Sequence, residues 1–208
     1  MNKSIKLFLS FLILSSQQFA QDTQSKSENS EWDFNSSLYT YFIPDDFFLL
    51  PILTADKSEL HLEARYNYED RNTFSGWIGY NFQTGEELEF TATPMIGAVL
   101  GNINGVAPGL ELELLYSSFE LYSESEYLFN IEDGSGNYFY VWTELTYSPI
   151  DWLWVGIVGQ RTRAYQTELD VQRGVLAGGS YSIFELAGYL FNIGNDDAYF
   201  MLSIAALF

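Results

Sequence analysis

Apolar and polar residues alternate at every second position through most of this chain, and that period limits its fold more than any other feature. In residues 58–70 the apolar positions alternate with polar ones: Leu60, Leu62, Ala64, Tyr66 and Tyr68 against Glu59, His61, Glu63, Arg65, Asn67 and Glu69. A strand places such residues on two opposite faces, whereas a helix would scatter them around its circumference. Ranges 110–116, 119–131 and 138–148 repeat the pattern. The sequence therefore predicts an all-β protein.

Tight turns alternate with longer polar or glycine-rich connections along the chain, as in an up-and-down antiparallel barrel. Ten strands are predicted in this way: 58–69, 74–84, 88–101, 109–116, 119–131, 138–148, 152–165, 171–181, 184–193 and 198–208. A hairpin of 32–43 and 47–55, turning at residues 44–46, would give twelve. The alternative leaves 32–55 outside a ten-stranded barrel, and Pro51 favours it because proline cannot donate to a ladder. An even count holds in both cases, and we favour twelve strands.

The beginning of the chain has the features of a secretory signal peptide. Lys3 and Lys6 precede a short apolar run, 7–14, and Ala20 is a suitable residue before cleavage. Eight apolar residues are too few to cross a bilayer as a helix. We therefore predict a signal peptide at 1–20, a flexible periplasmic tail at 21–31 and a transmembrane barrel at 32–208.

A soluble β-sandwich would show the same alternation, so the medium around the barrel needs separate evidence. Aromatic residues make up 18% of the chain and flank the tight turns, as Tyr116 and Phe119 do around 117–118. Such rings prefer the headgroup level of a membrane. A sandwich core would instead place them in the middle of strands. The pattern favours a barrel with its apolar face in lipid.

The final strand has apolar residues on one face and ends on an aromatic residue: Phe200, Leu202, Ile204, Ala206 and Phe208. This resembles the insertion signal of bacterial outer-membrane β-barrel proteins, although no motif ties the chain to a characterised subfamily. The resemblance implies a Gram-negative outer membrane, with the bilayer and lipopolysaccharide as surroundings. It also implies that the barrel-assembly machinery recognises the C-terminal strand, with Phe208 as its last residue. We expect a monomer.

The polar face of the barrel must line its lumen, because charge facing lipid is costly. Counting back from the tight turn at 117–118 sets Glu111 across from Glu124, and Glu113 across from Tyr122. A similar count sets Glu126 near Glu144. A lumen charge cluster is predicted from these acids and three basic residues: Glu111, Glu113, Glu124, Glu126, Glu144, Arg65, Arg161 and Arg163. For 152–165 two registers are open, and we favour the one that turns Arg161 and Arg163 inward over the one that places them above the membrane edge.

The single histidine of the chain, His61, lies between two glutamates, and Glu59, His61 and Glu63 form a possible polar site in the lumen. A histidine beside carboxylates can serve as a general base or a metal ligand. His61 is predicted to face the lumen, however, and no serine stands two residues away on its face. We therefore expect no catalytic residues, and neither a metal nor another cofactor.

Composition narrows the function. The formal charge of −19 disfavours nucleic acid, and the absence of cysteine excludes disulfides and thiolate metal sites. Two passive functions remain open: a pore for small, cation-preferring solutes, or a structural barrel with a salt-bridged acidic lumen. The alternative is a lipid-modifying outer-membrane enzyme, a hydrolase or acyltransferase, that uses His61.

Overall fold

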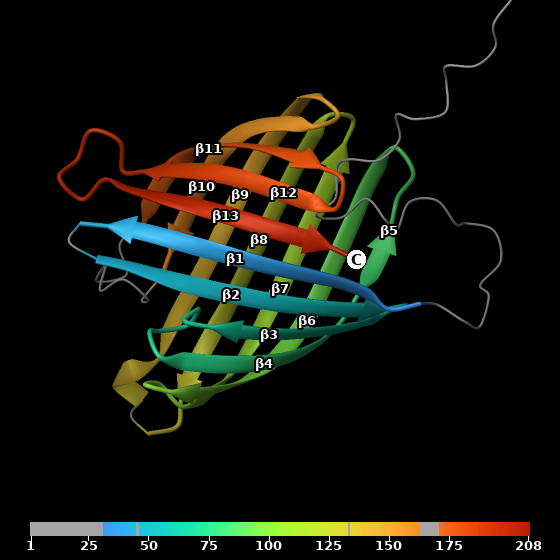
Figure 1. Ribbon diagram of the computed structural model, residues 1–208. Coiled ribbons are helices and arrows are strands. Elements are labelled where there is room, and N and C mark those ends of the chain that lie inside the picture. The colour runs from blue at the N-terminus through green and yellow to red at the C-terminus, as the bar shows by residue number, and fades with distance from the viewer. Residues whose placement is uncertain (1–30, 45, 133, 163–170) are drawn as a thin grey trace, which may run out of the picture.

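The computed structural model describes residues 31–44, 46–132, 134–162 and 171–208, and these form a closed antiparallel β-barrel (Figure 1). The strands, in chain order, are β1 (Asp33–Ile43), β2 (Asp46–Lys57), β3 (Leu60–Tyr66), β4 (Thr73–Tyr80), β5 (Phe82–Thr84), β6 (Leu88–Gly101), β7 (Gly105–Tyr116), β8 (Phe119–Asn130), β9 (Tyr138–Ile150), β10 (Leu153–Arg161), β11 (Gln172–Tyr181), β12 (Phe184–Phe191) and β13 (Tyr199–Leu207). Neighbours in sequence pair with each other, except that β4 and β5 both pair with β6, and β1 pairs with β13 to close the barrel.

β4 and β5 together form one interrupted strand, because both pair with β6 in a continuous register. The described strands therefore make a twelve-stranded barrel, and the prediction of twelve rather than ten is confirmed. The hairpin predicted at 32–43 and 47–55 is present as β1 and β2, with Ile43 opposite Asp46. The predicted signal peptide and all of the predicted tail except Glu31 lie outside the described residues.

Prolines lie where the hydrogen-bonded ladders are interrupted. Pro94 of β6 lies opposite the gap between β4 and β5. Pro108 falls within a gap in the β7–β8 pairing, and the β2–β3 pairing begins one residue after Pro51. Proline has no N–H to donate, so these positions accommodate it without the loss of a ladder bond. Pro51 is therefore compatible with a strand inside the barrel.

One predicted strand is too long. Residues 58–69 were expected to alternate throughout, but β3 ends at Tyr66, because Asn67 has a φ of 61° and turns the chain. Asparagine tolerates this left-handed conformation better than most residues. The Asn67 Nδ2 donates to the Leu49 carbonyl at 2.8 Å, which holds the turn. Tyr68 consequently points into the barrel, and its predicted place on the apolar outer face is wrong.

The outer face of the barrel is apolar over most of its height. Phe74, Ile78 and Ile96 leave 51%, 53% and 53% of their surfaces exposed, and similar residues continue around the other strands. Soluble proteins rarely expose so much contiguous apolar surface. In the described residues no helix has the length and apolarity needed to cross a membrane. The alternation of apolar outer and polar inner residues matches the pattern of barrels that lie in lipid.

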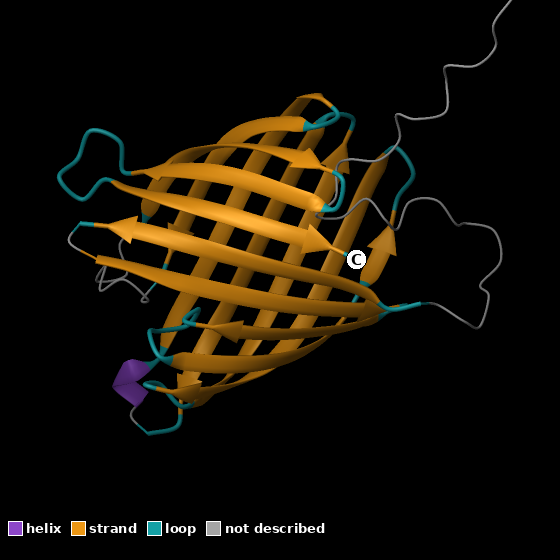
Figure 2. Cartoon of the chain, viewed as in Figure 1, coloured by secondary structure: helices purple, strands orange, loops and turns teal. Residues whose placement is uncertain are grey.

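The two ends of the barrel differ in their connections. The turn end carries the tight connections 58–59, 117–118, 151–152 and 182–183, together with the start of β1 and the end of β13. The loop end carries the connections 67–72, 102–104, 131–137 and 192–198. Figure 2 shows the short 3-10 helix η1 (Gly134–Gly136) at the end opposite the C-terminus. The two ends of the lumen can therefore be told apart by the connections around them.

Candidate functional site

The half of the lumen nearer the turn end holds a cavity of about 320 Å³, called here the acidic cavity. Eight carboxylate side chains line it: Asp56, Glu63, Glu111, Glu113, Glu120, Glu124, Glu144 and Glu185. His61 is the only basic side chain among the described residues of the lining, which includes no lysine or arginine. The cavity is therefore strongly negative.

The half of the lumen nearer the loop end is filled by side chains and is called here the packed half. It includes Val99, Leu128, Phe191 and Met201, which are fully buried. The ring of Phe191 stacks on that of Tyr199 at 4.7 Å and meets Trp142 edge-on at 5.9 Å. Gln160 donates to Gln172 at 2.9 Å in the same region. The packed half thus combines close apolar and aromatic contacts with a few buried polar side chains.

Arg65 lies at the boundary between the two halves and is 1% exposed. Its guanidinium lies 2.5 Å from carboxylate oxygens of both Glu63 and Glu124. It is also 3.3 Å from Glu126 and 3.8 Å from Glu111. One cation therefore faces four carboxylates that come from three strands, β3, β7 and β8. Arginine suits this role because its planar group offers five donors.

Aromatic rings complete the surroundings of Arg65. The guanidinium lies over the rings of Tyr68 and Trp77, 4.3 and 4.6 Å from their centroids. The Tyr68 hydroxyl lies 2.6 Å from a Glu124 oxygen and 2.7 Å from the Tyr140 hydroxyl. A buried cation is stabilised by such ring faces as well as by anions. The network joins strands on opposite sides of the lumen, which fixes the barrel's cross-section at this level.

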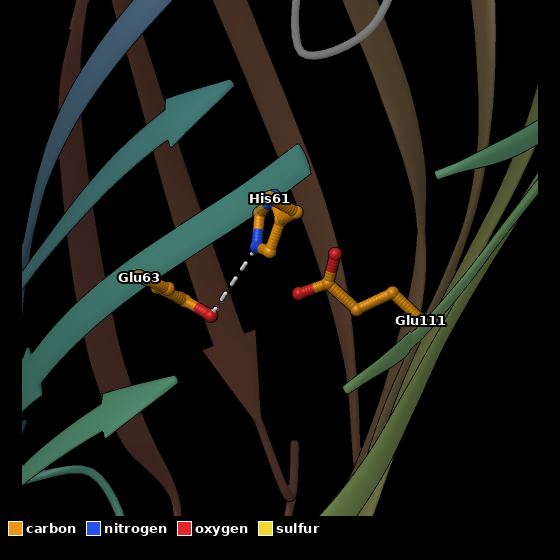
Figure 3. Close-up of side chains that lie close together, drawn as sticks. All are labelled: His61, Glu63 and Glu111. Atoms are coloured by element: carbon orange, nitrogen blue, oxygen red, sulfur yellow. Dashed lines mark ion pairs between the residues drawn. The ribbon is translucent and has the colours of Figure 1, made fainter. Parts of the chain in front are cut away.

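His61 faces the acidic cavity, and a chain of polar side chains fixes its ring on the Nδ1 side. Its Nδ1 lies 2.8 Å from an Asp56 oxygen, and the same oxygen accepts from the Asn81 amide at 2.8 Å. The Asn81 oxygen in turn accepts from the Thr93 hydroxyl at 2.6 Å. The Nε2 lies 3.8 Å from Glu63, and Figure 3 shows Glu111 reaching toward the same space from β7. Thus His61 and Glu63 of the predicted polar site lie on the lumen wall, while Glu59 precedes β3 and does not line the cavity.

The predicted register of the acidic cluster is right on one side of β8 and wrong on the other. Glu111 is opposite Glu124 and Glu113 is opposite Tyr122, as predicted. Glu144 was expected near Glu126, but it pairs with Tyr122 and accepts from the Trp142 ring N–H at 2.9 Å. The long connection 131–137 sets this register, and its length gave the sequence count no fixed starting point. Glu144 therefore lies on a part of the cavity wall separate from the acids around Arg65.

The preferred orientation of Arg161 is also wrong. Val158 and Gln160 are buried, whereas Val155 and Ile157 are exposed, so Arg161 belongs to the outward-facing set of β10. It lies at the loop end of that strand and donates to the carbonyl of Phe139. This is the second of the two registers considered from the sequence. Arg163 lies outside the described residues.

Several residues of the site were not singled out from the sequence. Asp56 pairs directly with His61 across the β2–β3 hairpin, and a register count from the tight connection 58–59 could have found it. Glu120 and Glu185 lie beside tight turns and offered the same signal. Tyr68 could not be found in this way, because the turn at Asn67 reverses the face it occupies.

At the turn end of the barrel, Phe208 follows the last residue of β13. Its N–H donates to the Phe34 carbonyl at 3.0 Å, and its carbonyl accepts from the Phe34 N–H at 2.8 Å. The two rings stack at 6.1 Å. The final residue therefore takes part in the seam where β1 closes the barrel against β13.

Comparison with solved structures identifies similar barrels. The KdgM porin matches with a TM-score of 0.62 and 10% identity, covering 83% of this chain and 98% of the porin. The KdgM porin in complex with disordered oligogalacturonate matches with a TM-score of 0.60 and 8% identity, again over 83% and 98%. No family model and no curated protein matches the sequence. These likenesses confirm the fold of outer-membrane β-barrel proteins.

Proposed function

We propose that this protein is a porin-like channel of a bacterial outer membrane that favours small cations. The observation that carries the proposal is the lining of the acidic cavity, in which eight carboxylates face the lumen without a lysine or arginine among the described lining residues. Rings of acidic side chains favour cations in channels. The apolar outer face supports a place in lipid.

The solute should differ from the one named for the similar porin. Oligogalacturonate is a polyanion, and the structure compared above holds it in a KdgM porin. A cavity lined by carboxylates repels a polyanion and attracts counter-ions of the opposite sign. The proposal therefore assigns small cations, rather than acidic sugars, to this barrel. The packed half narrows the described lumen, so we expect a small conductance.

The zero-current potential across a planar bilayer with a potassium chloride gradient tests the proposal. A cation-selective channel gives a potential of the sign set by potassium. Glu144→Gln and Glu185→Gln should each weaken the preference, because a unit charge near the path is worth about 1 kcal/mol at 4 Å in water, or roughly fivefold in local cation concentration. Thr54→Ser, also on the cavity wall, is the neutral control. Anion selectivity in the folded wild-type protein would contradict the proposal.

A structural barrel with a filled lumen is the second candidate, and the burial of Arg65 among four carboxylates favours it. Small barrels commonly have packed interiors. This candidate predicts that the folded protein stays electrically silent in bilayers. The same recordings therefore separate the two functions.

The enzymatic alternative has less support. A lipid-modifying enzyme needs its histidine beside the lipid substrate, whereas His61 lies on the inner wall and is 6% exposed. Lipid turnover by wild-type protein that is lost in His61→Gln would restore this alternative.

A further inference from the structure

One nitrogen of His61 makes no hydrogen bond among the described residues and has a Glu63 oxygen 3.8 Å away, although the residue is only 6% exposed. That atom is Nε2. The other ring nitrogen, Nδ1, lies 2.8 Å from Asp56. A carboxylate only accepts hydrogen bonds, so Nδ1 carries a proton, and a metal ion bound at Nε2 would take the place of any proton on that nitrogen. A buried polar atom without a hydrogen bond is costly, and 3.8 Å is too long for one, so a ligand between Nε2 and Glu63 would satisfy both groups.

Two carboxylates converge on the same space. Ligand atoms of His61, Glu63 and Glu111 all lie within 4.8 Å of one another. Figure 3 shows Nε2 directed toward Glu63, with Glu111 approaching from the other side. Bonds from zinc to imidazole and carboxylate ligands are about 2.0–2.2 Å long. Closing the three atoms around an ion therefore needs shifts of about 1 Å in side chains, and Glu111 is exposed enough to supply most of that movement.

We infer that His61, Glu63 and Glu111 bind a divalent transition-metal ion such as Zn²⁺ on the wall of the acidic cavity. One imidazole with two carboxylates favours zinc and its first-row neighbours over calcium and magnesium, which prefer oxygen ligands alone. All three residues line the cavity, so a fourth coordination position opens into the lumen. The inference does not depend on ion conduction.

The surroundings of His61 are those of a metal ligand. Metal-bound histidines usually donate their second N–H to a carboxylate, which fixes the ring's tautomer and orientation. Asp56 takes this position here. Its oxygen also accepts from the Asn81 amide, and the Asn81 oxygen accepts from the Thr93 hydroxyl. Glu63 also lies 2.5 Å from Arg65, which keeps its carboxylate in place. Asp56 is thus assigned as a positioning residue for His61.

Zinc binding to the untagged, folded barrel in detergent tests the site by isothermal titration calorimetry. We expect one tight Zn²⁺ per chain that survives an excess of Ca²⁺ or Mg²⁺. His61→Gln and Glu111→Gln should abolish it, and Asp56→Asn should weaken it about 10- to 100-fold. Glu113→Gln is the matched control, because it removes a charge from the same strand and the same cavity wall. That variant should bind Zn²⁺ as the wild type does.

Electron paramagnetic resonance of the Cu²⁺-loaded wild-type protein gives a second readout that needs no variant to fold. The chain contains a single histidine, so a coupling to one imidazole nitrogen identifies His61 as a ligand. A spectrum of oxygen ligands only would overturn the inference. So would a loss of Zn²⁺ affinity in Glu113→Gln as large as in His61→Gln, because the acidic cavity would then attract ions without a specific site.

Discussion

The two halves of the lumen differ in the side chains that line them. The packed half is narrowed by apolar and aromatic side chains such as Leu128 and Phe191, which are fully buried. The acidic cavity remains open, because its carboxylates repel one another and need water or cations. Arg65 lies between the two and contacts several acids at once. One chain can therefore build both a core and a charged cavity on the inner face of a single barrel.

Arg65→Met should give the largest loss of stability. It leaves the carboxylates of Glu63 and Glu124 buried without their cation, and breaking such a buried pair costs about 3–5 kcal/mol. Urea unfolding in lipid vesicles, followed by tryptophan fluorescence, measures the change. Arg71→Met is the control, because its pair with Asp46 is exposed. A loss of stability no greater than that of the control would mean that the ion pairs of Arg65 do not stabilise the barrel.

Phe191→Ala should come next. Its ring is fully buried against Tyr199, and truncation of such a residue costs about 3 kcal/mol. The same change should widen the packed half and raise single-channel conductance. Phe184→Ala, on the outer face of the same strand, should do neither. Equal effects of the two variants would mean that the packed half is not a core.

Removing a charge from the acidic cavity should leave the stability of the barrel unchanged or raise it. Glu111→Gln relieves a repulsion with Glu124 directly across the ladder, so in metal-free buffer it should be neutral or stabilising by up to about 1 kcal/mol. Glu120→Gln is the comparison, since Leu115 and Thr146 lie opposite Glu120. The same unfolding assay decides the sign. A clear destabilisation by Glu111→Gln would show that the cavity is held together by its acids.

The contrast between the halves also explains what the sequence could predict. Alternation assigned the faces of the strands, and the two-residue connection 117–118 fixed the pairing of Glu111 with Glu124. Prediction failed where no tight turn constrains the chain. Glu144 was misplaced across the connection 131–137, and Tyr68 changed face at the left-handed Asn67.

The inward orientation predicted for Arg161 was wrong for a different reason. Its strand carries apolar residues on both faces, so desolvation of arginine was the only guide. The structure buries Gln160 and Thr162 inside and places Arg161 at the loop end, where it donates to the Phe139 carbonyl. Periodicity assigns a face only when the two faces differ in polarity.

Thiol labelling tests the division of the lumen most directly, because the natural chain has no cysteine. Ser37 lines the acidic cavity, whereas Ser75 is fully buried in the packed half, and both can be changed to cysteine with little change in size. Ser37→Cys should react quickly with a cationic methanethiosulfonate, more slowly with an anionic one, and Ser75→Cys should react with neither until the barrel unfolds. Equal labelling of the two sites, or faster reaction of Ser37→Cys with the anionic reagent, would contradict the division of the lumen into an acidic cavity and a packed half.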